Sequence, residues 1–131
     1  MMYEIKLKVA KENSKGEMKE VREHFITDVT FFAEAEVKGL ELYNNQADVY
    51  AITRSKIKEI INEKKDEYPF FKAVVVDVFT NDEGVEKELQ YAILVCGKDI
   101  NDAQKLVEEY LKQGFDMKLK EIKETKILDV L

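Results

Sequence analysis

The sequence predicts an α+β fold made of two β-β-α-β repeats related by a pseudo-twofold axis. The first observation is a loop sequence at residues 13–21 that returns at 81–89, with a glycine at the same place in each copy. The second is that apolar and polar residues alternate on either side of the loops, which is typical of strands. The third is a stretch with apolar residues at helical spacing after each strand pair. Two copies favour a paired domain, because a solenoid needs at least three stacked repeats.

The first repeat is expected to span residues 1–61 and to open with a β-hairpin. Residues 3–9 alternate strictly between apolar and polar side chains, which predicts a half-buried strand. Residues 13–16 form the loop, where Gly16 can adopt the left-handed conformation that closes such a turn. Residues 18–27 form the return strand, so we expect a mostly antiparallel sheet.

A helix and a third strand complete the first repeat. Thr30 is a candidate N-cap for a helix over residues 31–43, and the pair Asn44-Asn45 can end this helix in place of glycine. Residues 48–60 then predict one long polar strand. Because a helix with a single apolar stripe needs only one buried side, we expect the two helices on one face of the sheet.

The second repeat is expected to span residues 70–131 with the same order of elements. A linker at 62–69 precedes it and carries the only proline. This linker is too short to separate independent domains, so we expect a single domain over residues 1–131. The elements of the second repeat are predicted as strands over 70–79, 86–96 and 116–130, a loop over 81–84, and a helix that Asp99 caps and Gly114 ends.

The strand at 73–76 is apolar on both faces, unlike Lys6-Leu7-Lys8 in the first repeat. A strand of this kind is usually covered on both sides. Together with residues 68–71 it carries more apolar surface than one helix can cover. Because an uncovered strand of this kind is an aggregation site, we expect self-association, with a homodimer as the assembly.

Composition restricts the class of protein. The chain has 131 residues, of which 45% are hydrophobic and 37% charged, as in a folded soluble domain. No apolar run approaches the roughly 18 residues of a membrane span. Cys96 is the only cysteine, so an intrachain disulfide is excluded and a cytoplasmic location is expected. The apolar residues before Cys96 predict that its side chain packs as a small hydrophobe.

No residue pattern indicates catalysis. His24 is the only histidine, and no second histidine or cysteine stands at ligand spacing, so we expect no metal site. No glycine-rich phosphate motif is present, and we expect no cofactor. Acids are plentiful, but they fall in hairpins and on solvated strand faces. The sequence therefore indicates a protein without enzymatic activity.

Cationic residues recur on the strands that close the two repeats. Together with Tyr50 they predict a nucleic-acid-binding face made of Arg54, Lys56, Lys58, Lys118, Lys120, Lys123 and Lys126. Lys6, Lys8 and Arg22 could join this face from a neighbouring strand. Tyr50 and His24 would then lie among these cations. A sheet face with cations and an aromatic ring can follow a single-stranded backbone and stack its bases.

The alternative is that these cations form an ordinary solvated sheet face. The net charge of −6 argues against an extended basic surface. The acids that could offset the cations are Glu4, Glu59, Glu121 and Glu124.

Four segments resemble a known family. They are Tyr-Glu-Ile-Lys at 3–6, Phe-Ala-Glu-Ala-Glu at 32–36, Ala-Ile-Thr-Arg-Ser-Lys at 51–56 and Glu-Thr-Lys-Ile-Leu-Asp-Val at 124–130. On these motifs the chain resembles, over nearly its whole length, the family of domain of unknown function 4494 from gut Bacteroidetes and their phages. The resemblance implies a phage or mobile-element setting, where small acidic proteins often serve replication or counter host defence. It implies no catalytic residue, because the family has no established activity.

Two functional hypotheses follow from these observations. The first is a non-enzymatic binding protein of phage origin that engages single-stranded nucleic acid through its sheet. The second is a protein–protein inhibitor or adaptor, such as an anti-defence factor. A contiguous basic patch would favour the first, and an exposed apolar patch around Val74, Val76 and Val78 would favour the second.

Overall fold

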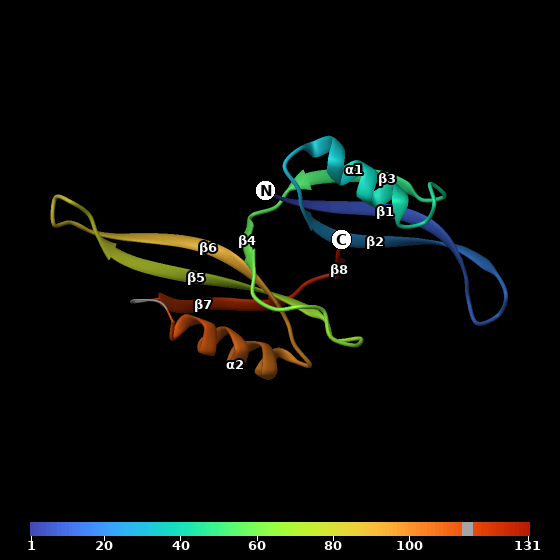
Figure 1. The fold of residues 1–131 in the computed structure, drawn as a ribbon. Helices are drawn as coiled ribbons and strands as arrows, with labels where there is room; N and C mark the ends of the chain where they lie inside the picture. The colour runs from blue at the N-terminus through green and yellow to red at the C-terminus, as the bar shows by residue number, and fades with distance from the viewer. Residues whose placement is uncertain (114–116) are drawn as a thin grey trace. The chain divides into compact units, whose positions relative to one another are not determined.

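The computed structural model describes residues 1–113 and 117–131, which form two compact units (Figure 1). Unit one holds Met1–Ser55 and Lys126–Leu131, and unit two holds Lys56–Thr125. The chain therefore leaves unit one after Ser55 and returns to it after Thr125. Each unit combines a helix with a mixed, mostly antiparallel sheet, which confirms the predicted α+β class.

Unit one is a four-stranded sheet with one helix packed on it. Its elements are β1 (Met2–Glu12), β2 (Met18–Asp28), α1 (Phe32–Glu41), β3 (Asp48–Arg54) and β8 (Ile127–Val130). The strand order is β3-β1-β2-β8. β1 pairs antiparallel with both β2 and β3, whereas β8 pairs parallel with β2.

The core of unit one lies between β1 and α1. Tyr3, Ile5 and Leu7 are buried, as the alternation of the first strand predicts. A Cβ atom at Gly39 of α1 would lie 3.0 Å from the Ile5 side chain and 3.1 Å from the Val49 side chain. The missing side chain therefore lets the helix pack close to the sheet. The residues between the core positions of β1 point to the opposite face, which α1 does not cover.

The two ends of α1 differ in how well the sequence predicts them. The helix starts one residue later than expected, with Phe31 as the N-cap residue and no side-chain cap, so the prediction of Thr30 as N-cap is wrong. Thr30 lies one position too early for its hydroxyl to reach the first free amides. Asn44 and Asn45 adopt positive φ angles of 52° and 65°, as predicted for residues that end a helix without glycine.

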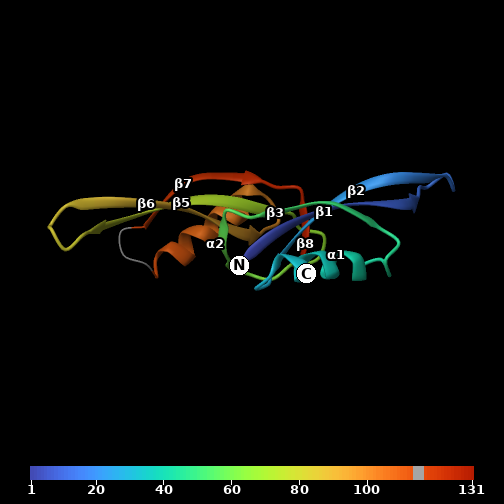
Figure 2. The same ribbon diagram turned by 90° about the horizontal axis from the view of Figure 1, so that it is seen from above.

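Unit two has the corresponding set of elements. They are β4 (Ile57–Ile60), β5 (Phe70–Thr80), β6 (Glu86–Cys96), α2 (Ile100–Leu111) and β7 (Met117–Glu124). The strand order is β4-β6-β5-β7, which is the order of unit one read from the opposite edge. Figure 2 shows α2 along one face of its own sheet, where Ala103 and Val107 pack against Ala73 and Val75.

The start of α2 agrees with the sequence. The Asp99 side chain accepts a hydrogen bond of 2.8 Å from the backbone N–H of Asp102, so the predicted cap is confirmed. The predicted stop at Gly114 lies outside the described residues.

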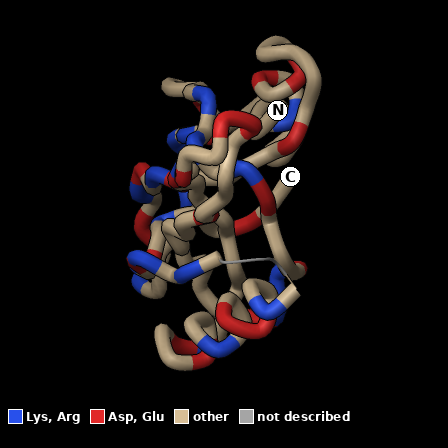
Figure 3. The backbone as a smooth tube through the Cα atoms, turned by 90° about the vertical axis from the view of Figure 1, so that its left-hand side faces the viewer, with Lys and Arg blue, Asp and Glu red and all other residues tan. Residues whose placement is uncertain are grey.

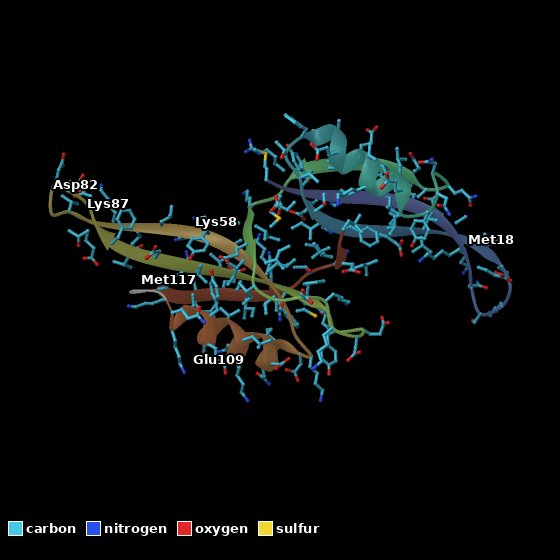
Figure 4. All side chains as sticks on the ribbon, in the orientation of Figure 1. Met18, Lys58, Asp82, Lys87, Glu109 and Met117 are labelled. Carbon is cyan, nitrogen blue, oxygen red and sulfur yellow. The ribbon has the colours of Figure 1, made fainter. Side chains whose placement is uncertain are left out.

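The two hairpin loops have the same local structure. Gly16 and Gly84 have φ angles of 78° and 79°, a region that favours glycine. The side chains of Asn13 and Asn81 each accept hydrogen bonds from two backbone N–H groups of their own loop. Figure 4 labels Met18 beside the first loop and Asp82 and Lys87 beside the second. The two similar loop sequences therefore form turns of the same conformation. The pseudo-twofold axis that we expect to relate the two repeats stays a prediction.

The long third strands expected at 48–60 and 116–130 are wrong, because each is two strands. β3 ends at Arg54 and β4 begins at Ile57; β7 ends at Glu124 and β8 begins at Ile127. At each break a backbone N–H bonds back into its own unit, from Ser55 to the Met2 carbonyl and from Thr125 to the Phe70 carbonyl, both at 2.9 Å. The next strand belongs to the other unit. The first sequence repeat therefore contributes β4 to unit two, and the second contributes β8 to unit one.

Cys96 is only 3% exposed inside unit two, which confirms that its side chain is buried, and the Sγ atom also accepts a hydrogen bond from the backbone N–H of Lys65 at 3.4 Å. The Asn62 amide donates to the Cys96 carbonyl at 2.8 Å and accepts from its backbone N–H at 2.7 Å. Neither α1 nor α2, the helices of the described residues, is long and apolar enough to cross a membrane.

Candidate functional site

A cavity of about 270 Å³ opens on the face of the unit-one sheet that α1 does not cover. Every residue around it belongs to unit one. The lining residues are Lys6, Arg22, Glu23, His24, Tyr50, Lys126 and Leu128. They come from all four strands of the sheet and from Lys126, which directly precedes β8.

Strand alternation explains why cationic side chains gather on this face. Lys6 stands opposite His24 in the pairing of β1 with β2, and Lys8 stands opposite Arg22. Directly opposed residues of a strand pair point to the same face. Because Ile5 lies in the core under α1, its neighbour Lys6 points to the uncovered face.

β-Bulges place Tyr50 and Leu128 on the two sides of the cavity. In the pairing of β1 with β3 the register moves from Lys6–Ala51 to Leu7–Val49, so that Tyr50 has no opposing residue. In the pairing of β2 with β8, the register likewise skips Leu128. A bulge redirects a side chain from the regular pleat, and here it supplies an aromatic and an aliphatic side chain to a cationic face.

Two cations contact the ring of Tyr50, which is 40% exposed. Lys8 Nζ lies 5.0 Å from the ring centroid and Arg22 Cζ lies 5.8 Å from it. Both distances are in the range of cation–π attraction. The ring therefore contacts two cations while remaining open to solvent.

Like charges stand side by side in this arrangement. Lys8 and Arg22 are directly opposed, a pairing that costs stability in a two-stranded ribbon. Asp48, opposite Lys8 in β3, compensates in part. Farther along β1 and β2 the face becomes acidic, with Glu12 and Glu20. The excess of positive charge is therefore local to the cavity, and Figure 3 shows cations and acids interspersed along the chain.

His24 forms part of the cavity wall beside an acid. Its Nε2 lies 2.9 Å from Oε1 of Glu4, which is within ion-pair distance. The same Nε2 is buried and has no hydrogen-bond partner of good geometry among the described residues.

The corresponding face of unit two has a different chemistry. Val74 and Val76 occupy the register positions of Lys6 and Lys8, and Gln90 and Ala92 those of Arg22 and His24. The residues skipped by the matching bulges are Lys120 and Lys58. Lys58, labelled on β4 in Figure 4, lies 4.8 Å from the Tyr91 ring centroid. The two units therefore share their backbone plan and differ in the side chains of this face.

The structure divides the sequence-predicted site residues between the units. Tyr50 and Lys126 line the cavity together with Lys6 and Arg22, and Lys8 contacts the Tyr50 ring. Arg54 stands opposite Tyr3 at the end of β3, so it belongs to the face that α1 covers. The remaining predicted residues belong to unit two, and they are Lys56, Lys58, Lys118, Lys120 and Lys123.

Sequence reasoning missed Leu128 and the bulges. In these polar strands the alternation of apolar and polar residues is weak. A change in its phase at a bulge therefore cannot be recognised from the sequence. The repeated Ser-Lys-Ile and Thr-Lys-Ile segments at 55–57 and 125–127 are the signal that could have located the strand exchange, since both mark the point where the chain changes unit.

A polar cluster surrounds Glu23, which is also one of the residues that line the cavity. Lys11 Nζ contacts Glu23 Oε2 at 3.0 Å, and the Tyr43 hydroxyl donates to the same carboxylate. The hydrogen bond to Tyr43, followed by that to Glu23, raises the pKa of Lys11. Burial, followed by the Glu23 hydrogen bond, raises the pKa of Tyr43. These mutually satisfied partners tie the segment after α1 to β1 and β2, which is a structural role.

Metal ligands do not gather in the described part of the chain, where no group of three or more His, Cys, Asp and Glu side chains could hold an ion. The cavity lining combines the cations Lys6, Arg22 and Lys126 with an aromatic and an aliphatic side chain, while its acid, Glu23, is already bonded by Lys11 and Tyr43. This combination suits an anion that carries a flat or apolar group.

Comparison with known proteins gives one match. The family model described as domain of unknown function (DUF4494) matches residues 1–131. No curated protein and no solved structure matches the chain. Because the match covers the whole sequence, the chain belongs to the DUF4494 family.

Proposed function

We propose that this protein is a small non-enzymatic binding protein that engages single-stranded nucleic acid through the cavity face of unit one. The observation that carries the proposal is the Tyr50 ring, which both Lys8 and Arg22 contact, beside a cavity with Lys6 and Lys126. Single-strand binders combine cations for the backbone with aromatic rings on which bases stack. This face supplies both within one unit.

The proposal covers a short contact. The cations at the cavity can meet only a few phosphates, and the acids along the hairpin prevent the strand from continuing in that direction. Binding then depends on salt to a modest degree, because each phosphate contact to a single strand contributes about −0.7 to the slope of log affinity against log salt.

Charge reversal of Arg22 tests the proposal with a variant that should remain folded, so that a loss of binding cannot be caused by misfolding. Arg22→Glu replaces the repulsion between Lys8 and Arg22 with an attraction and removes the contact of Arg22 with the Tyr50 ring, so the free energy of unfolding should change by no more than about 0.5 kcal/mol. The same change should weaken binding of a labelled single-stranded oligonucleotide about tenfold at low salt, measured by fluorescence anisotropy. Lys38→Glu is the matched control, because it makes the same charge change in unit one on exposed α1.

The results separate the possibilities clearly. Weaker binding by Arg22→Glu at a nearly unchanged melting temperature supports the proposal, with Lys38→Glu binding as the wild type does. Equal losses in the two variants would mean that only net charge matters, and the cavity face would not be the interface.

A protein–protein adaptor, such as an anti-defence factor, is the second candidate. The observation that favours it is apolar exposure on unit two. Val74, Val76 and Val78 are half-buried, and Phe79 and Leu89 are 46% and 47% exposed on β5 and β6. If wild-type protein binds no oligonucleotide at low salt, this function takes first place.

The setting is part of the proposal. The family resemblance supports an origin in gut Bacteroidetes or their phages, with the protein acting in the host cytoplasm. The apolar strand β5 supports a homodimer as the working form.

A further inference from the structure

We propose that the unit-one cavity binds one nucleotide as a discrete ligand, so that a free nucleoside 5′-monophosphate occupies it without any longer chain. This inference rests on the proposed function and names the unit of ligand that the site recognises. It assigns the phosphate to the cationic side chains of the cavity and the base to the ring of Tyr50, with Leu128 on the other side of the cavity.

The size of the cavity limits the ligand. At about 270 Å³ it lies just below the range of about 300–1,000 Å³ that encloses drug-sized molecules. One nucleotide, or part of one, can therefore enter, whereas several consecutive nucleotides cannot. Any further length of a bound strand would lie outside the cavity on the sheet.

The two kinds of lining side chain require a ligand with two kinds of surface. Lys6, Arg22 and Lys126 offer charged donors, which bind phosphate oxygens more strongly than neutral donors do. Tyr50 and Leu128 offer surface for a flat ring and stand on bulges of the two outer strands. Inorganic phosphate uses only the cations and a nucleoside only the uncharged side chains, so each should bind more weakly than the nucleotide.

The side chains of unit two indicate how many nucleotide sites the chain has. At the positions of Lys6, Arg22 and His24, unit two has Val74, Gln90 and Ala92. These uncharged side chains cannot replace the cations. We therefore expect one nucleotide per chain, located on β1, β2, β3 and β8.

The experiment compares thymidine 5′-monophosphate with thymidine and with inorganic phosphate, using the full chain. Calorimetry gives affinity and stoichiometry, and amide chemical shifts in the ¹⁵N-labelled protein locate the site. The nucleotide should bind one per chain and about tenfold more tightly than either fragment, with shifts confined to unit one.

Two variants sharpen the result. Tyr50→Leu keeps an apolar side chain at an exposed position and should weaken the nucleotide about tenfold. Lys120→Ala changes the corresponding bulge residue of unit two and should leave nucleotide binding unchanged. The dispersion of the amide spectrum shows whether each variant is folded.

The outcomes distinguish a failure of the nucleotide-site inference from a failure of the proposed function. Oligonucleotide binding without nucleotide binding overturns this inference and leaves the proposed function standing. Phosphate binding as tight as nucleotide binding overturns it too, because the cavity is then a simple anion site. Shifts on unit two, or an equal loss from Lys120→Ala, place the ligand elsewhere and contradict it. If neither oligonucleotide nor nucleotide binds, both proposals fail.

Discussion

Tyr50 stands on a β-bulge, and we expect its side chain to contribute to ligand binding rather than to the stability of the fold. A regular strand would pair this residue with β1, whereas the bulge leaves it unopposed and 40% exposed. Tyr50→Leu should therefore change the free energy of unfolding by no more than about 0.5 kcal/mol, as surface substitutions do. It should cost about 1–3 kcal/mol in oligonucleotide affinity if a base stacks on the ring. Chemical denaturation and anisotropy measure the two quantities, and a large loss of stability would contradict a purely ligand-facing role.

Tyr110 makes stability depend on pH in a predictable direction. Its hydroxyl donates to the Glu59 carboxylate, which ties α2 to β4. Burial, followed by this hydrogen bond, raises the pKa of Tyr110 to about 12, against about 10 in the unfolded chain. Because the folded state holds the proton more tightly, this stabilisation is complete below pH about 10 and is lost as pH rises to about 12.

The Tyr110→Phe variant lacks this titration. Between pH 10 and 12 its melting temperature should fall less than that of the wild type, because the other tyrosines are common to both proteins. Parallel curves for the two proteins would show that the hydroxyl of Tyr110 carries no such linkage.

Gly97 is required by close approach rather than by its φ angle. A Cβ atom there would lie 3.0 Å from the backbone N and Cα of Ala103 in α2. Backbone atoms cannot move aside as a flexible side chain can, so Gly97→Ala should destabilise the protein by about 1–3 kcal/mol. Urea denaturation measures this loss. A variant as stable as the wild type would mean that α2 is free to shift away from the β6 end.

At the scale of elements, the exchanged strands β4 and β8 hold each unit closed with only four residues apiece. Ile57 and Ile127 are their buried anchors, each 4% exposed. Either isoleucine replaced by alanine should cost about 2–5 kcal/mol. Amide hydrogen exchange should accelerate in β6 for Ile57→Ala and in β2 for Ile127→Ala, since these are the strands to which β4 and β8 pair. Faster exchange in β2 for Ile57→Ala and in β6 for Ile127→Ala would contradict the assignment of β4 to unit two and of β8 to unit one.

Local sequence predicted the elements well wherever one short stretch contained the whole signal. The hairpin loops around Gly16 and Gly84, the cap at Asp99 and the left-handed turn at Asn44 after α1 each depend on residues within a few positions. The breaks after Arg54 and Glu124 could not be predicted in this way. Whether a strand continues or crosses to another sheet is decided by distant pairing, and the polar character of these segments is the same on both sides of the break.

At the scale of the whole molecule, the same limit applies to the candidate site. The sequence pattern grouped Tyr50 with Lys126, and both line the cavity, but it also included lysines that the fold places in unit two. Strand exchange separates Arg54 from Lys56, although only Ser55 stands between them in the chain. The composition of the site therefore depends on the register of four strands, and a local sequence pattern cannot predict this register.

Self-association is the prediction that belongs to the apolar strand of unit two. Val74 and Val76 remain half-buried on the face that α2 does not cover. We expect a dimer that buries them, so Val74→Lys or Val76→Lys should yield monomers. Light scattering at micromolar concentration gives the mass directly. A monomeric mass for the wild type would count against the dimer and would leave these valines as an unpartnered surface.

The most direct test of the central claim is the affinity of wild-type protein for a labelled single-stranded oligonucleotide at several salt concentrations. The account places four cations at the cavity face, Lys6, Lys8, Arg22 and Lys126. With about −0.7 per phosphate contact, the slope of log affinity against log salt should lie between about −1 and −3. No binding at low salt, or binding with a slope near zero, would contradict the claim that this face holds a nucleic-acid backbone.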